Sequence, residues 1–168
     1  MRTWFVGGII GVGILVALFF CFYPLHTVLT VSAATGGDTV LCAPMAEGEE
    51  FVISFVHSVN KRPVYDTLRV EGDHLVIVKS RFDSFGAGMP DGSTTEGTLS
   101  IGKDGWIEWT INRPVPEVTV RVGRVAEHVL HFKGREIRLS ELAEPGKALS
   151  FKVEKGSFVR AMKGRCMR

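Results

Sequence analysis

The sequence predicts a small all-β domain, either an antiparallel sandwich or a closed barrel of about ten short strands, preceded by one transmembrane helix. Three observations predict this class. Beyond residue 24, apolar and polar residues alternate with a period of two, as they do along half-buried strands. Turn signals recur about every 8–12 residues, which is typical of sandwiches and barrels. The first two dozen residues are instead almost entirely apolar.

Each apolar or alternating run between turn signals is expected to form one strand. The expected strands are Val28–Ala33, Thr39–Ala43, Phe51–Val59, Pro63–Val70, His74–Phe82, Gly97–Ile101, Trp106–Ile111, Val118–Val122, Val129–Lys133, Glu136–Leu139 and Leu149–Glu154. Two prolines in Asn112–Pro116 should break the strand that precedes them. The one helical signal is Ser140–Ala143, a single turn that Ser140 could cap.

The N-terminal run Trp4–Tyr23 has 20 residues, about the number that a helix needs to cross a bilayer. Arg2 is the only positively charged side chain in the first 60 residues, so the positive-inside rule places the N-terminus in the cytoplasm and the β domain outside. A signal peptide cleaved after Val31-Ser32-Ala33 is the alternative, but cleavage would remove an expected strand. We therefore expect a single-pass cell-membrane protein: an anchor at 1–24, a β domain at 28–154 and a basic tail at 155–168.

The net charge and the cysteine content of the chain say little about its function. The formal net charge is only +2, so nothing indicates nucleic-acid binding. The tail interleaves basic and apolar residues, and it either lies on anionic lipid headgroups of the bilayer or is solvated. Of the three cysteines, Cys21 lies inside the expected span. Cys42 and Cys166 would face an oxidising compartment, where they either pair or remain two unpaired thiols.

The most specific part of the chain runs from Phe51 to Gly92. Its motifs are His57-Ser58-Val59, then Pro63-Val64-Tyr65-Asp66, then Phe82-Asp83-Ser84-Phe85-Gly86-Ala87-Gly88-Met89-Pro90. In these motifs the chain resembles the bacterial and archaeal domain-of-unknown-function 1850 family, over essentially everything after the anchor. The resemblance implies an extracytoplasmic β domain, often encoded beside or fused to TRAP-type transporter subunits of the TAXI subclass, with no established activity.

Two positions depart from the pattern of that family. An acidic residue often stands where this chain has Asn60, and Glu is frequent where it has Asp66. The second difference keeps the charge, whereas the first removes one and weakens any electrostatic role for position 60.

Catalytic and metal-binding patterns are weak. His57 and Ser58 are adjacent, so on a strand they point to opposite faces and do not form a nucleophile–base pair. A Ser-His-Asp set would need Ser84 or Ser58 with a distant His128 and an aspartate, and no nucleophile elbow accompanies them. No histidine pair has the spacing of a structural zinc site. We expect no metal and no cofactor.

The loop Ser84–Gly92 supports two interpretations. Gly86 and Gly88 could supply positive φ for a tight connection that ends at Pro90. Alternatively, its backbone N–H groups could cradle an anion beside Arg62 and Arg81.

A short Asn60–Arg62 turn would pair residue 57 with residue 65 and place Asp66 diagonal to His57, where the carboxylate would raise the pKa of the imidazole. We therefore expect a non-enzymatic accessory or binding module of a TRAP-type (TAXI) system, in contact with its permease or solute-binding protein. An extracytoplasmic hydrolase and a purely structural domain are the alternatives. The candidate ligand- or partner-binding residues are His57, Ser58, Asp66, Arg81, Ser84, Gly86, Gly88, Pro90 and His128.

Overall fold

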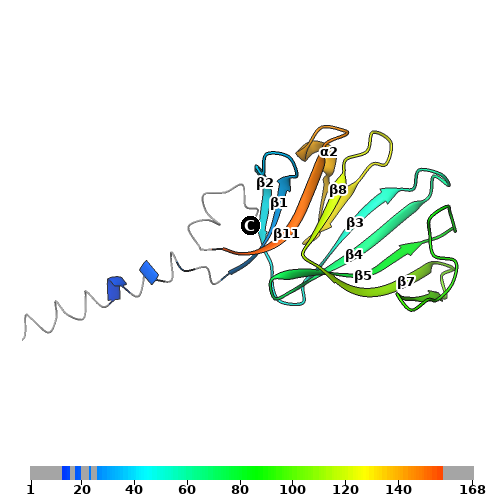
Figure 1. Ribbon diagram of the computed structural model, residues 1–168, viewed down its shortest axis with the longest axis horizontal. Helices are drawn as coiled ribbons and strands as arrows, with labels where there is room; N and C mark the ends of the chain where they lie inside the picture. Colours follow the sequence, from blue (N-terminus) through cyan, green and yellow to red (C-terminus); the bar gives the residue numbers. More distant parts are fainter. Residues whose placement is uncertain (1–12, 16–17, 20–22, 24–25, 157–168) are drawn as a thin grey trace, which may run out of the picture.

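The computed structural model describes residues 13–15, 18–19, 23 and 26–156 (Figure 1). Most of the expected span Trp4–Tyr23 lies outside these residues, as does nearly all of the basic tail. Within the described part of the chain, no helix is long and apolar enough to cross a membrane. The expected transmembrane helix is therefore not supported by the structure.

The described residues form two antiparallel sheets, as predicted for a sandwich, and neither sheet closes into a barrel. The smaller sheet has the order β2-β1-β11-β8, with β1 His26–Ala33, β2 Thr39–Pro44, β8 Glu117–Arg121 and β11 Ala148–Gly156. The larger has the order β10-β9-β3-β4-β5-β7-β6, with β3 Glu50–Val56, β4 Pro63–Glu71, β5 His74–Phe82, β6 Thr98–Ile101, β7 Ile107–Val115, β9 Val129–Phe132 and β10 Arg135–Arg138.

The main core lies between the two sheets. Alternate residues of β1 and β11, such as Leu29, Val31 and Phe151, are fully buried against Phe51 of β3 and its neighbours in the larger sheet. The rings of Phe51 and Phe151 stack with their centroids 6.4 Å apart, which joins the sheets directly. Cys42 of β2 is also buried in the smaller sheet, and it is disulfide-bonded rather than a free thiol. The other two cysteines lie outside the described residues.

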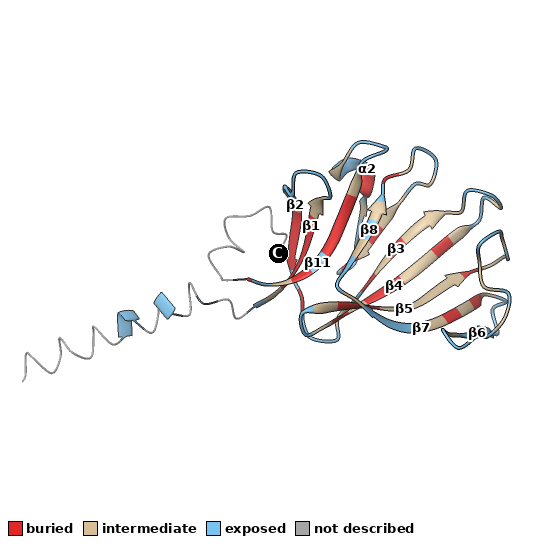
Figure 2. Ribbon diagram, in the orientation of Figure 1, coloured by how far each residue is buried: buried red, intermediate tan, exposed pale blue. Residues whose placement is uncertain are grey.

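The larger sheet extends beyond the smaller one (Figure 1). At this end, Val64, Phe82, Ile107 and Trp109 form a second apolar cluster, which includes Met89 but no residue of the smaller sheet. Figure 2 shows buried positions near both ends of β4 and β5, separated by half-buried stretches. The smaller sheet therefore covers only part of the inner face of the larger sheet. We call the uncovered part of that face the overhang.

The chain passes from one sheet to the other at Pro116. The expected break at Asn112–Pro116 is wrong, because β7 continues to Val115 and β8 begins one residue after Pro116. Strand β6 opposes only Ile107–Thr110 of β7, so the rest of β7 is an edge strand. A proline is tolerated there, and Pro114 pairs with Val76 of β5.

Two other boundaries differ from expectation. Strand β3 ends at Val56 rather than Val59, because the chain turns at residues 58–60 and Lys61 takes a positive φ of 57°. The helical turn α2 covers Leu139–Leu142, and the residue before it, Arg138, makes no side-chain cap bond. The expected capping role of Ser140 is therefore wrong, since Ser140 lies inside the turn.

Truncation of the inter-sheet contact tests where the core lies. Phe151→Ala should lower the free energy of unfolding by about 3–5 kcal/mol, because the ring is fully buried. Urea unfolding of the full-length chain in mild detergent measures this. Ile101→Ala, at a side chain that is 67% exposed, is the control and should change stability little. Equal losses for the two variants would contradict a core between the sheets.

Candidate functional site

A single carboxylate, Asp66, interrupts the apolar inner face of the larger sheet. Along β4 it alternates with the buried residues Val64 and Leu68, so it faces the same side. Its cross-strand neighbours are Ile53 on β3 and Ser80 on β5. Ser80 in turn pairs with Trp109 on β7. Asp66 therefore lies between the two apolar clusters, where the overhang begins.

The pairing of Asp66 with Ser80 depends on a β-bulge. From the turn, the β4–β5 hairpin pairs Glu71 with His74 and continues in register as far as Leu68 opposite Ile77. Continued in the same register, it would set Asp66 opposite Lys79. The register shifts there, so Thr67 pairs with Lys79 and Asp66 pairs with Ser80. The bulge sends Lys79 to the outer face, where its ammonium lies 2.9 Å from Glu108.

Burial raises the pKa of the Asp66 carboxyl above its usual range, and the Ser80 hydroxyl, which donates a hydrogen bond of 2.5 Å, offsets part of that effect. No basic side chain contributes to the shift. Asp66 is thus a carboxylate with a neutral hydrogen-bond donor and no salt bridge, in surroundings that disfavour its charge.

A cavity of about 450 Å³ opens on the overhang beside Asp66. Its walls are mainly apolar, and its polar side chains include two serines, a histidine and Asp66. No lysine or arginine is among the described residues that line it. The lining residues are Phe55, Val56, His57, Ser58, Val64, Asp66, Ser80, Phe82, Gly88, Met89, Pro90, Trp109 and Ala126. A second cavity of about 280 Å³ shares Phe55 and Asp66 as a common wall. We call the larger one the Asp66 cavity.

His57 and Ser58 line the Asp66 cavity, but the expected hairpin register is wrong. Val56 pairs with Pro63, so Asp66 is opposite Ile53 and far along the strand from His57. Residues 57–62 therefore connect β3 to β4, twice the three residues expected. A hydrogen bond from the backbone N–H of His57 to the carbonyl of Arg62 closes this connection. The His57 Nδ1 accepts the N–H groups of Val59 (3.3 Å) and Asn60 (3.5 Å). His57 thus orders its own turn.

His128 and Arg81 do not line the Asp66 cavity. His128 borders the second cavity, with its ring 5.7 Å from that of Phe55, and burial lowers its pKa. Arg81 lies on the outer face, because it alternates with the inward residues Ser80 and Phe82. There its guanidinium pairs with Asp104 and lies 4.7 Å from the Trp106 ring centroid. Of the nine predicted residues, five therefore line the Asp66 cavity and four do not: His57, Ser58, Asp66, Gly88 and Pro90 line it, and Arg81, Ser84, Gly86 and His128 do not.

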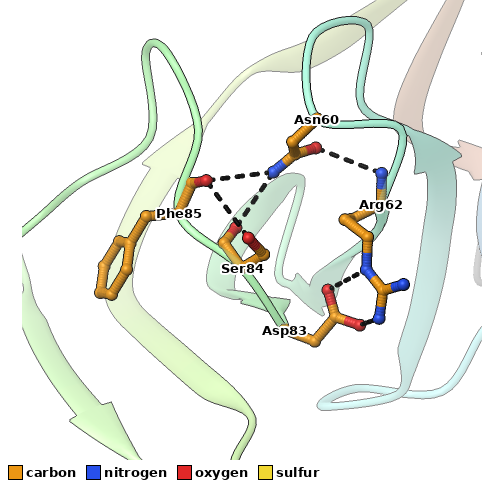
Figure 3. A network of polar contacts seen from close by, with 5 residues as sticks. All are labelled: Asn60, Arg62, Asp83, Ser84 and Phe85. Carbon is orange, nitrogen blue, oxygen red and sulfur yellow. Dashed lines mark hydrogen bonds and ion pairs between the residues drawn. The ribbon is translucent and has the colours of Figure 1, made fainter.

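A polar network fastens the β3–β4 turn to the loop after β5 at the mouth of the cavity (Figure 3). The Asn60 side-chain amide donates to the carbonyls of Ser84 (3.2 Å) and Phe85 (3.3 Å), and its oxygen accepts the N–H of Arg62. Arg62 also forms a bidentate ion pair with Asp83. An acidic residue at position 60 could not donate to those carbonyls. Asn60 therefore has a structural role that its lack of charge did not predict.

The two predicted glycines serve different purposes. Gly88 has φ of 82°, as expected for a tight connection, and a Cβ there would meet nothing within 4 Å. Gly86 does not have a positive φ, so that part of the prediction is wrong. A Cβ on Gly86 would lie 2.9 Å from Asn60 Nδ2 and 3.2 Å from His57 Cε1. Gly86 is needed because the Asn60 network passes close to it.

The described residues do not form the Ser-His-Asp set or the anion clamp that the sequence left open, and they do not form a metal site. Asp66 bonds Ser80, the Ser84 hydroxyl donates to the carbonyl of Phe85, and His57 accepts from its own turn; none of these bonds joins two members of a Ser-His-Asp set. Arg62 and Arg81, the proposed anion clamps, are held by Asp83 and Asp104. The described residues contain no cluster of three or more His, Cys, Asp or Glu placed to hold a metal ion.

Sequence reasoning missed Ser80, Asn60 and the aromatic walls of the cavity. Phe55 and Trp109 looked like ordinary core residues, because nothing in the alternation shows that the smaller sheet stops short of them. Three exposed apolar side chains, Val59, Phe85 and Val125, also lie next to residues of the mouth. We call these three the rim patch.

The different roles of the glycines predict different couplings. Gly86→Ala should cost on the order of 1–3 kcal/mol by displacing Asn60 from its bonds. The double variant Gly86→Ala/Asn60→Ala should then cost less than the sum of the single ones. Gly88→Ala, strained only in its backbone, should be additive with Asn60→Ala. Thermal unfolding of all five variants measures this, and equal coupling for both glycines would refute the distinction.

The stability of the domain should depend on pH because of Asp66. A carboxyl whose pKa rises on folding stabilises the fold fully below its unfolded pKa, 3.8, and loses that contribution as pH rises through the folded value. Asp66→Asn, whose side-chain oxygen can still accept from Ser80, should therefore melt higher than wild type at pH 7. The two should converge towards pH 3.8. A wild-type chain that is the more stable at pH 7 would mean that Asp66 has a cationic partner.

The comparisons with known proteins identify a family and no function. The model of the family described as a domain of unknown function (DUF1850) matches residues 51–139. The matched region contains β3 to β7, the loop at the cavity mouth and His128, so it includes the entire Asp66 cavity. No curated protein and no solved structure matches the chain. Because the family model covers more than half of the 168 residues, the chain belongs to the domain-of-unknown-function 1850 family.

Proposed function

We propose that the chain is a non-enzymatic accessory binding module, with the Asp66 cavity as its ligand site and the rim patch as a contact surface for a protein partner. The partner is the permease or the solute-binding protein of a TRAP-type (TAXI) uptake system. Residues 1–24 anchor the module in the cell membrane, and the β domain lies outside the cytoplasm. The link to transport rests on what the family resemblance implies, and the topology rests on the apolar run and Arg2.

One observation carries the binding role. Asp66 sits in an apolar wall without a salt bridge, although a leucine or asparagine would complete the same face at lower cost. Proteins keep such destabilising groups mainly at functional sites. The volume of the cavity lies within the range of small-molecule sites, about 300–1,000 Å³, and its mainly apolar walls with few polar groups match their usual composition.

A purely structural role explains less. A residue kept for the fold should bond a partner that would otherwise be unsatisfied. Among the described residues, however, Asp66 accepts a hydrogen bond only from the Ser80 hydroxyl, and water can satisfy a hydroxyl as well. A hydrolase centred on the Asp66 cavity would need a base held against a nucleophile there. The Ser54 hydroxyl does lie 2.7 Å from His131 Nε2, but Ser54 alternates with the inward residues Ile53 and Phe55 and is on the outer face of the larger sheet. The hydroxyls of Ser80 and Ser84 are instead bonded to a carboxylate and a backbone carbonyl. Binding is therefore the function that the site supports best.

The rim patch offers a second, protein-sized surface at the same mouth. Val59 and Phe85 are 64% and 48% exposed, and they lie on the two loops that Asn60 joins. Val125, 70% exposed, precedes the cavity-lining residue Ala126, whose carbonyl accepts the N–H of Val56. Exposed apolar residues gathered at one place often mark a protein contact. A partner docked there would cover the cavity.

Disruption of the rim patch tests the proposal. The double variant Val59→Ser/Phe85→Ser should lose at least tenfold of its co-purification with the TRAP permease or solute-binding protein in mild detergent, because it removes the exposed apolar contacts. Its melting temperature should stay close to that of wild type. Ile101→Ser, equally exposed on the edge strand β6, is the matched control and should retain the partner. Capture of neither transporter component by the wild-type chain would refute the proposal, as would undiminished capture by the double variant.

A further inference from the structure

We propose that the ligand of the Asp66 cavity is an amphipathic organic cation: an apolar body that fills the aromatic part of the cavity and one amine-type positive charge that pairs with Asp66. This inference rests on the proposed binding function and adds the chemical class of the ligand.

The charge of the cavity selects the sign of the ligand. Among the described residues that line the cavity, Asp66 is the only carboxylate, and none is a lysine or arginine. Lys79 and Arg81, which flank the lining residue Ser80 in sequence, pair with Glu108 and Asp104 on the outer face. Arg62, two residues before Val64, pairs with Asp83. Arg121 borders the second cavity and donates to the carbonyl of Gly146. An anionic ligand would place a second negative charge against Asp66 with nothing to offset it.

The β-bulge shows how the cavity lacks its own cation. Without the register shift, Lys79 would lie opposite Asp66 on the inner face and could neutralise it. The shift puts Ser80 there instead, and Lys79 pairs with Glu108 on the other side of the sheet. Ser80 donates one hydrogen bond to Asp66 Oδ1. No described residue forms a hydrogen bond or ion pair with the other carboxylate oxygen, which can therefore receive a ligand cation.

The walls suit the apolar body of such a cation. Phe55, Phe82 and Trp109 line the cavity together with Met89. Aromatic rings attract cations through their quadrupoles, with tryptophan the strongest, and sites for alkylammonium groups combine such rings with a carboxylate. A purely apolar ligand would use these walls but would leave the half-buried Asp66 charge with the Ser80 hydroxyl as its sole described partner.

The test uses three probes of one shape: 4-phenylbutylamine, 4-phenylbutan-1-ol and 4-phenylbutyrate. Binding to the full-length chain in mild detergent is measured by titration calorimetry at pH 7. The amine should bind at least tenfold more tightly than the alcohol, and the acid should bind most weakly. Asp66→Asn should lose at least tenfold in affinity for the amine and leave that for the alcohol nearly unchanged. Asp73→Asn is the matched control, because it removes the same charge from an exposed turn, and it should bind the amine as wild type does. Each probe partitions into the detergent to the same extent in the samples of wild type, Asp66→Asn and Asp73→Asn. Partitioning therefore does not affect the comparison among the three proteins.

Two outcomes would overturn the inference. Equal or tighter binding of the alcohol or the acid, unaffected by Asp66→Asn, would show that the cavity binds ligands but is not selective for cations; the proposed binding function would then stand. Binding of none of the three probes would also reject the cationic class. The binding function would still be judged separately by partner capture at the rim patch, which does not involve these probes.

Discussion

The larger sheet has more inner face than the smaller sheet covers, and the rest of the structure depends on this inequality. Where the sheets overlap, Phe151 and its neighbours close the core on Phe51. Where they do not, the overhang is capped by Met89 from the loop after β5. A loop fits less closely than a second sheet, so space remains between the two apolar clusters. Asp66 stands on the wall of that space.

The loop that closes the overhang is held by few bonds, and they differ in value. The Arg62–Asp83 pair is exposed on the arginine side, and such pairs contribute about 0–1 kcal/mol. The Asn60 amide instead satisfies two backbone carbonyls, which fixes the loop in position relative to the β3–β4 turn. Gly86 permits this close approach. The shape of the cavity mouth therefore depends more on neutral hydrogen bonds than on charge.

The period-two alternation predicted the all-β class and every strand, because burial on one face is a local property of the sequence. The residues of the candidate site were predicted only in part, because whether a residue lines the cavity depends on which face of the sheet it occupies. Arg81 and Ser80 are adjacent, yet only Ser80 faces the cavity. The β-bulge moves this assignment by one residue, and nothing in His74–Phe82 marks it. The 57–62 connection was also misjudged, since Lys61 adopts a positive φ that its residue type does not indicate.

The bulge and the half-buried carboxylate of Asp66 are best understood together. A regular hairpin would have brought Lys79 to Asp66 and produced an internal ion pair, whose attraction would about balance its desolvation cost. Such a pair would be neutral and would leave no unpaired charge on the cavity wall. In the shifted register Lys79 does not neutralise Asp66, which instead accepts a hydrogen bond from the Ser80 hydroxyl. The domain thus carries an electrostatic cost that the Ser80 hydroxyl offsets only in part, and a cation supplied from outside is the chemical species that would offset the rest.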